Sequence, residues 1–182
     1  TGECSADASS VNLTGSDNME KIYNYLRSKG LSPEQTAGAW GNISVESAGT
    51  GDPEIVQGGS RASDPTNISS GWGIIQWTPG SKIIGLLDQA GITSPPNQLS
   101  TQLELVWWHM NDTTPTGVRN FMNEYKGITD VAQATEVYML KMEAPGIPHL
   151  EDRISRAKEA LRKYEGGGST TTPVVYESTG GC

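Results

Sequence analysis

Apolar side chains recur at three- and four-residue spacing along most of the chain, which is the pattern of amphipathic helices. The first such stretch follows Ser16 and Asp17 and ends at Gly30. The second opens with SPEQ at residues 32–35, a capping box with proline at the first helical position, and extends to Glu46. Five further helices are predicted, at residues 81–90, 100–111, 116–125, 130–143 and 148–164.

The last predicted helix has an apolar side and a charged side. Leu150, Ile154, Ala157 and Leu161 lie at helical spacing and are expected to face the core. The cations of this and the first helix are expected on solvated faces, and Arg153 is one of them.

Helical periodicity fails between Ala48 and Trp77, where glycines interrupt the chain repeatedly. The run IIQW at residues 74–77 favours a short strand. The predicted fold class is therefore α+β and mainly α: a helical domain with a small irregular β region directly after the helix that ends at Glu46. A loop of this length inside a compact domain is more often functional than accidental.

The two ends of the chain differ from its middle in composition. Residues 1–15 and 166–182 are small, polar and aperiodic, so we expect flexible tails on either side of one domain at residues 16–165. Each tail contains one cysteine, Cys4 or Cys182. A disulfide between them would contribute about 4–5 kcal/mol by the chain-entropy model, and two free thiols are the alternative.

Charge and composition exclude several classes of function. The chain has 13 Lys and Arg against 21 Asp and Glu, a net charge of −8, and such a surface repels the phosphate backbone of nucleic acids. It contains no run of about 18 apolar residues that would span a membrane. Neither His109 nor His149 has a second His or Cys at ligand spacing, so we expect no metal site. We also expect a monomer without an organic cofactor.

Glu46 is the leading candidate for chemistry. Gly38 and Gly41 make its helix thin, so neighbouring elements can cover the helix and partly desolvate the carboxyl group, which disfavours the charged form. A protonated carboxyl group is what a general acid needs to protonate a glycosidic oxygen. The indoles of Trp72 and Trp77 would stack on sugar rings, and Gln76 can donate and accept hydrogen bonds; these three are the predicted substrate-binding residues.

The order of these motifs resembles a known family. A helix ending in GNISVESAG, a glycine-rich loop and then GWGIIQW are similar to the lysozyme-like superfamily, most closely the phage tail lysozyme family. The similarity continues through TQLELVWWHM and EVYMLKMEAPGIPHLEDRISRAKEAL and covers residues 16–164.

The resemblance implies a lysozyme-like fold and a muramidase, which cuts the β-1,4 bond between N-acetylmuramic acid and N-acetylglucosamine in the glycan strands of peptidoglycan. Glu46 would be the proton donor, and Trp72, Gln76 and Trp77 would line the cleft. It implies a secreted or particle-associated protein, acting alone or within a larger surface or tail protein. Three alternatives stay open: a lytic transglycosylase with 1,6-anhydro products, a non-catalytic glycan-binding or structural module, and a glycosidase acting on chitin-type polymers.

A second carboxylate is harder to assign. Asp52, Glu54 and Asp64 all follow Glu46 in the loop, and Asp64 lies about where lysozyme-like enzymes often have a partner, although Asp-Pro is also an ordinary turn sequence. We take Asp64 as the candidate. Glu143, beside a Pro-Gly break, is expected to have a structural role, either bracing the cleft or pairing with Arg153.

Overall fold

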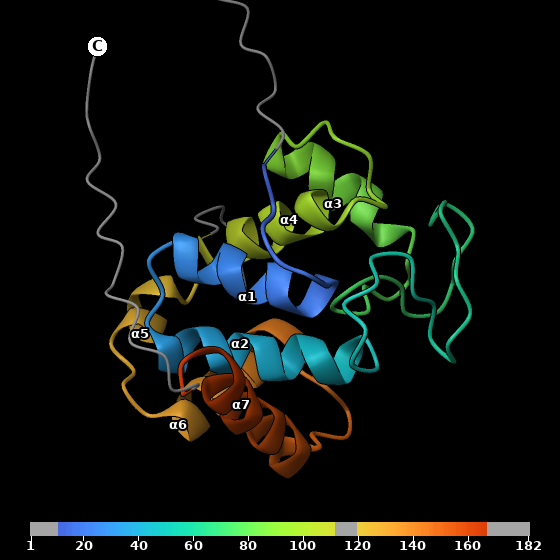
Figure 1. Cartoon of the computed structure of the whole chain (residues 1–182). Helices are drawn as coiled ribbons and strands as arrows, with labels where there is room; N and C mark the ends of the chain where they lie inside the picture. The colour runs from blue at the N-terminus through green and yellow to red at the C-terminus, as the bar shows by residue number, and fades with distance from the viewer. Residues whose placement is uncertain (1–10, 112–119, 167–182) are drawn as a thin grey trace, which may run out of the picture.

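The computed structural model describes residues 11–111 and 120–166. Helices dominate these residues, and their β structure is limited to three isolated bridges. The described residues do not include Cys4 and Cys182, residues 1–10 and 167–182 of the predicted tails, or residues 116–119 of the fifth predicted helix. The elements, labelled in Figure 1, are α1 (Asn18–Ser28), α2 (Pro33–Glu46), α3 (Lys82–Ala90), α4 (Leu99–Asn111), α5 (Met122–Lys126), α6 (Val131–Tyr138), the π-helix η1 (Met139–Glu143) and α7 (Leu150–Tyr164).

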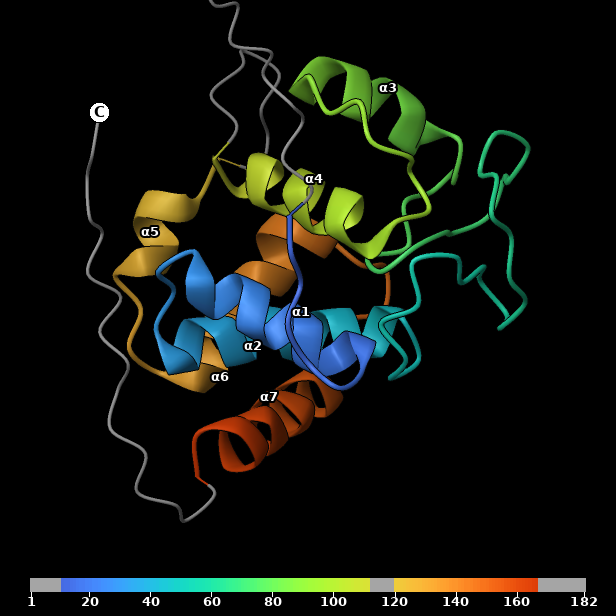
Figure 2. The same ribbon diagram turned by 45° about the horizontal axis from the view of Figure 1, so that its top comes forward.

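The centre of the fold is α2, which packs against α1, α6 and α7 (Figures 1 and 2). Every residue from Gln35 to Ser44 is buried, so this helix has no solvent-facing side over ten consecutive positions. Helices α3 and α4 pack together on the other side of α1. Because α2 is enclosed up to Ser44 and ends at Glu46, the Glu46 carboxylate lies where the helix emerges from the core.

Two glycines let α6 and α7 approach the backbone of α2 closely. A Cβ placed on Gly38 would lie 2.8 Å from the backbone of Ala134 and Thr135 in α6. A Cβ on Gly41 would lie 2.5 Å from the carbonyl oxygen of Arg153 and 2.9 Å from the backbone nitrogen of Ala157 in α7. Gly38 and Gly41 thus make α2 thin, as predicted, and each allows one close helix contact. Gly38 contacts α6 and Gly41 contacts α7, two helices from the C-terminal part of the chain.

Replacing Gly41 with alanine is expected to lower the free energy of unfolding by about 2 kcal/mol, because the methyl group would displace α7. For a domain of this size the melting temperature would fall by about 4–8 °C, measured by thermal unfolding. The matched control is Gly85→Ala in α3, where a Cβ meets nothing within 4 Å. There the better helix propensity of alanine should raise stability by about 0.5–1 kcal/mol, and equal effects at both sites would contradict the packing argument.

The buried face of α7 differs from the predicted one. Its fully buried side chains are Arg153, Ala157 and Ala160, whereas Leu150, Ile154 and Leu161 flank this face and are half-buried. The prediction that Arg153 lies on a solvated face is wrong, since its exposure is 2%. Ala157 faces Gly41 because the two backbones are too close there for leucine or isoleucine.

The glycine-rich region at residues 48–80 extends from the end of α2 and is drawn in cyan to green in Figures 1 and 2. The predicted strand at residues 74–77 is wrong, because residues 73–76 form turns. The turns lie between Trp72 and Trp77, whose backbones exchange two hydrogen bonds of 3.1 and 3.0 Å. The segment GWGIIQW is therefore a tight loop closed by a single β-bridge between Trp72 and Trp77. Gly73, with φ +82°, permits the turn and is not part of a pleated strand.

Candidate active site

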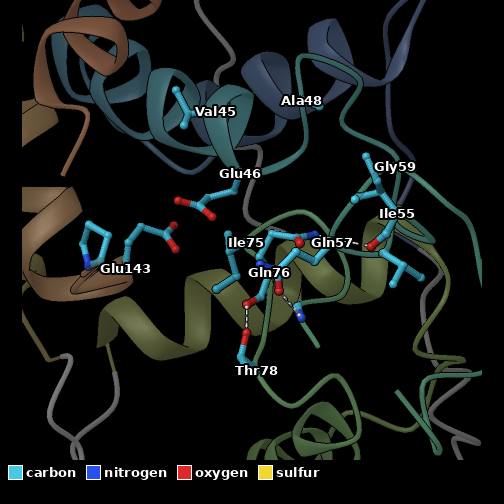
Figure 3. A pocket seen from close by; sticks show the side chains of 14 residues that line it. Val45, Glu46, Ala48, Ile55, Gln57, Gly59, Ile75, Gln76, Thr78 and Glu143 are labelled. Atoms are coloured by element: carbon cyan, nitrogen blue, oxygen red, sulfur yellow. Dashed lines mark hydrogen bonds between the residues drawn. The ribbon is translucent and has the colours of Figure 1, made fainter. Parts of the chain in front are cut away.

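Glu46 is the last residue of α2 and lines an open pocket of about 410 Å³, shown in Figure 3. One wall comes from the end of α2, another from the glycine-rich region, and a third from the segment after α6. The pocket is open to solvent and mixes apolar and polar side chains. Its lining residues are Val45, Glu46, Ala48, Ile55, Val56, Gln57, Gly58, Gly59, Gly71, Ile75, Gln76, Thr78, Glu143 and Pro145.

The end of α2 is built as a Schellman motif. The backbone nitrogen of Gly49 donates to the carbonyl of Ser44 at 2.7 Å, and that of Ala48 donates to Val45 at 3.2 Å. Ala48 occupies the left-handed position of this motif with φ +52°, a conformation that costs a non-glycine residue about 1 kcal/mol. The helix therefore stops directly after Glu46, and the chain turns away from it to leave the carboxyl group at the pocket wall.

A buried arginine holds the Glu46 carboxylate. Arg153 Nη2 donates to Glu46 Oε1 at 2.6 Å, while Nη1 donates to Asn42 Oδ1 at 3.0 Å and Nε to the Pro148 carbonyl at 2.8 Å. The Glu46 side chain is 19% exposed and that of Arg153 only 2%. Arg153 thus orients one oxygen of Glu46 from behind.

The predicted stacking role of Trp72 and Trp77 does not fit their positions. Trp72 is 0% exposed and donates from Nε1 to the Ala62 carbonyl at 2.8 Å, and Trp77 is 3% exposed. Both indoles are packed in the core beneath the loop that they close, so neither has an exposed ring face, although Trp77 is among the residues that line a second, smaller pocket beside this one. Their contribution is to hold the residues between them, of which Ile75 and Gln76 line the pocket.

Gln76 does line the pocket, as expected for a binding residue, but its amide also has a structural task. Its Nε2 donates to the Gly73 carbonyl at 2.9 Å and to the Ile55 carbonyl at 3.3 Å. Its backbone is left-handed, with φ +53°. Gln76 therefore fixes the two halves of the glycine-rich region to each other at the pocket floor.

Sequence reasoning assigned no role to Gln102, which ties the same loop to α4. Its Oε1 accepts from the backbone nitrogen of Ile74 at 3.0 Å, and its Nε2 donates to the carbonyls of Pro53 and Pro96 at 2.7 and 2.9 Å. The side chain is fully buried. A buried glutamine with all these bonds satisfied fixes an irregular segment that has no regular ladder to stabilise it.

None of the three loop carboxylates lines the pocket. Glu54 pairs with Arg61 at 3.0 Å, and Asp52 accepts two hydrogen bonds from the same guanidinium. Partial burial opposes the charge of Asp52, but the bonds from Arg61 and from the backbone nitrogen of Glu54 outweigh it and lower the pKa of Asp52. These two carboxylates stabilise the fold of the loop.

Asp64 is fully exposed, and its side chain accepts from the hydroxyl and backbone nitrogen of Thr66. The side-chain bond, followed by the backbone bond, lowers the pKa of Asp64. This is the ordinary Asp-Pro turn that was the alternative interpretation. The assignment of Asp64 as the second catalytic carboxylate does not fit the structure, because the side chain lies outside the pocket that contains Glu46.

The carboxylate that does share the pocket with Glu46 is Glu143. Figure 3 shows the two side chains extending toward each other from opposite walls. Glu143 also lines a second, adjoining pocket of about 220 Å³, which shares Ile75, Gln76 and Thr78 with the first and adds Trp77, Lys82 and Met142. Together the two pockets make a longer groove across the site.

Among the described residues, no group of three or more His, Cys, Asp or Glu side chains is placed to hold a metal ion. None of the helices in the same residues is long and apolar enough to cross a membrane.

The enclosed central helix, the carboxylate at its end and the groove beside it define a lysozyme-like helical domain. The family model of the phage tail lysozymes matches residues 17–164, and the chain belongs to that family. The resemblance predicted from the sequence is therefore confirmed over nearly the same range.

A curated relative is named Morphogenesis protein 1 and comes from Bacillus phage B103. It is 28% identical to this chain over 156 residues, which are 84% of this chain and 40% of the relative. The chain thus spans less than half the length of that protein.

Proposed function

We propose that this domain is a peptidoglycan glycosidase that cleaves the β-1,4 bond between N-acetylmuramic acid and N-acetylglucosamine, with Glu46 as the general acid. The observation that carries the proposal is the position of Glu46 at the end of the enclosed helix, facing an open pocket while Arg153 holds one of its oxygens. Membership in the phage tail lysozyme family supports the same substrate.

The chemistry follows from this position. When Glu46 donates its proton to the glycosidic oxygen, the bond from that oxygen to C1 breaks and Glu46 becomes a carboxylate. The guanidinium of Arg153, 2.6 Å from Glu46 Oε1, stabilises the negative charge that this step creates. Arg153 acts only through Glu46, because its side chain is buried and does not line the pocket.

The groove suits a polymer. The two adjoining pockets of about 410 and 220 Å³ share four residues, so neighbouring sugars of one strand can occupy both. Because the indoles are buried, we expect the strand to be held by hydrogen bonds and by aliphatic side chains such as Ile75 and not by tryptophan stacking. The name of the phage B103 relative supports a place on a phage particle, within a longer protein.

The test is digestion of purified peptidoglycan followed by mass spectrometry of the released fragments. The proposal predicts new reducing ends on N-acetylmuramic acid. Fragments that end only in 1,6-anhydro-muramic acid would identify a lytic transglycosylase instead. If the folded protein binds the glycan strands and releases no fragments, it is a binding module and the enzymatic proposal is wrong.

A further inference from the structure

Glu143 reaches the pocket because of how the chain leaves α6. The last five residues of this helical segment form η1, in which the Ala144 nitrogen bonds to the Met139 carbonyl at 2.8 Å, five residues back. This wider turn rotates the end of the segment relative to an α-helix, and such insertions are frequent at functional sites. Met139 and Met142 are buried and anchor the turn, which fixes Glu143 at the wall of the pocket.

The chain then turns sharply. Ala144 is left-handed with φ +42°, and Pro145 follows and lines the same pocket. Three of the four non-glycine residues with positive φ in the described part of the chain, Ala48, Gln76 and Ala144, either line this pocket or lie between residues that do. The walls that bear Glu46 and Glu143 are thus both shaped by backbone conformations that cost energy, which is typical of functional sites.

We propose that Glu143 is the second catalytic carboxylate, the general base that activates water. The inference rests on the proposed function and adds to it the residue that completes the reaction. Glu143 and Glu46 line one pocket from opposite walls, so a bound sugar lies between them. Asp52, Glu54 and Asp64 line neither this pocket nor the adjoining one.

The reaction balances with these two groups and one water molecule. Glu46 gives its proton to the oxygen of the leaving sugar, and the bond between that oxygen and C1 breaks. Glu143 takes a proton from water as the water oxygen forms its bond to C1 on the opposite face of the ring. Solvent then returns a proton to Glu46 and removes one from Glu143. Attack from the opposite face converts a β-linkage into an α-configured product.

The first experiment compares variants on purified peptidoglycan. Glu143→Gln is expected to lower the rate of cleavage by about 100-fold or more, the usual contribution of a general base. The matched control is Glu136→Gln in α6, an exposed position outside both pockets, which should stay within about twofold of the unchanged protein. Circular dichroism verifies that each variant is folded.

The second experiment supplies azide to Glu143→Ala. A small anion in the space of the missing carboxylate needs no base to attack C1, so azide should restore cleavage and leave an α-glycosyl azide product. Azide should not restore Glu46→Ala, which lacks the proton for the leaving group. Failure of azide to restore a folded Glu143→Ala variant would count against the base role.

The third experiment needs no variant. Nuclear magnetic resonance of the first products of the unchanged protein should show the α-anomer. A β-anomer, products that are exclusively 1,6-anhydro, or full activity of Glu143→Gln would each overturn the assignment of Glu143 and leave peptidoglycan cleavage standing. Absence of cleavage by the unchanged protein, or full activity of Glu46→Gln, would overturn the proposed function itself, and this inference with it.

Discussion

Replacing Glu46 with glutamine is expected to reduce peptidoglycan cleavage by about 100-fold to 10,000-fold, the range that a positioned general acid contributes. Glutamine keeps the shape of the side chain, and its carbonyl oxygen can still accept the hydrogen bond from Arg153. It cannot give a proton to the glycosidic oxygen. The variant should therefore remain folded while the rate falls, measured as loss of turbidity of a peptidoglycan suspension.

The control for this variant is Asp64→Asn, which removes the carboxylate originally predicted from the sequence. Asp64 is exposed and, within the described part of the chain, bonded only to Thr66, so its loss should change the rate by less than about twofold. Unchanged activity in Glu46→Gln would refute the acid role. A large loss in Asp64→Asn would mean that the loop rearranges to bring Asp64 into the groove.

Replacing Arg153 with methionine is expected to lower the free energy of unfolding by about 3 kcal/mol, because it leaves Glu46 and Asn42 without their donor. We place the loss at the low end of the range for broken buried pairs because the Glu46 side chain is 19% exposed and retains some water. The corresponding fall in melting temperature is about 6–12 °C, measured by calorimetry.

The control lies one turn further along α7. Arg156 bonds to Asp152 at 3.1 Å and to the Ser44 hydroxyl at 3.0 Å, but its side chain is 33% exposed, so Arg156→Met should cost less than about 1 kcal/mol. Equal losses for the two variants would contradict the claim that the buried pair with Glu46 stabilises the fold more than an exposed pair does. The double variant Arg153→Met, Glu46→Gln should lose less than the sum of the single losses, since the two side chains bond to each other.

Most of the predicted helices agree well with the structure because their signals are local, whereas the described part of the fifth, predicted at residues 116–125, becomes helical only at Met122. The capping box at residues 32–35 is present, with Ser32 accepting from the Gln35 nitrogen and the Gln35 side chain accepting from Ser32. The start of α2 and its end near Glu46 needed no distant contact to be recognised. The strand predicted at residues 74–77 is wrong because the local signal there is ambiguous. Two apolar residues near a tryptophan fit a buried turn as well as a strand.

The candidate site was predicted only in part. Glu46 and Gln76, both named from the sequence, line the same pocket, and their roles in catalysis and binding remain predictions. The tryptophans were expected there because indoles suit sugars, yet residue type alone does not tell a binding surface from the core of a loop. A signal for the burial of Arg153 was present, since it lies four and seven residues before two alanines, on the small face of α7.

By itself, the sequence determined the order of the helices, the break after Glu46 and membership in the phage tail lysozyme family. Each of these depends on patterns among neighbouring residues or on the order of motifs along the chain. Tertiary structure alone decided which side chains meet at the pocket. Arg153 lies 107 positions from Glu46, and the facing carboxylate of Glu143 is nearly as distant. They come together because α6 and α7 pack against Gly38 and Gly41, and the periodic pattern within one helix does not tell which distant segment packs against it.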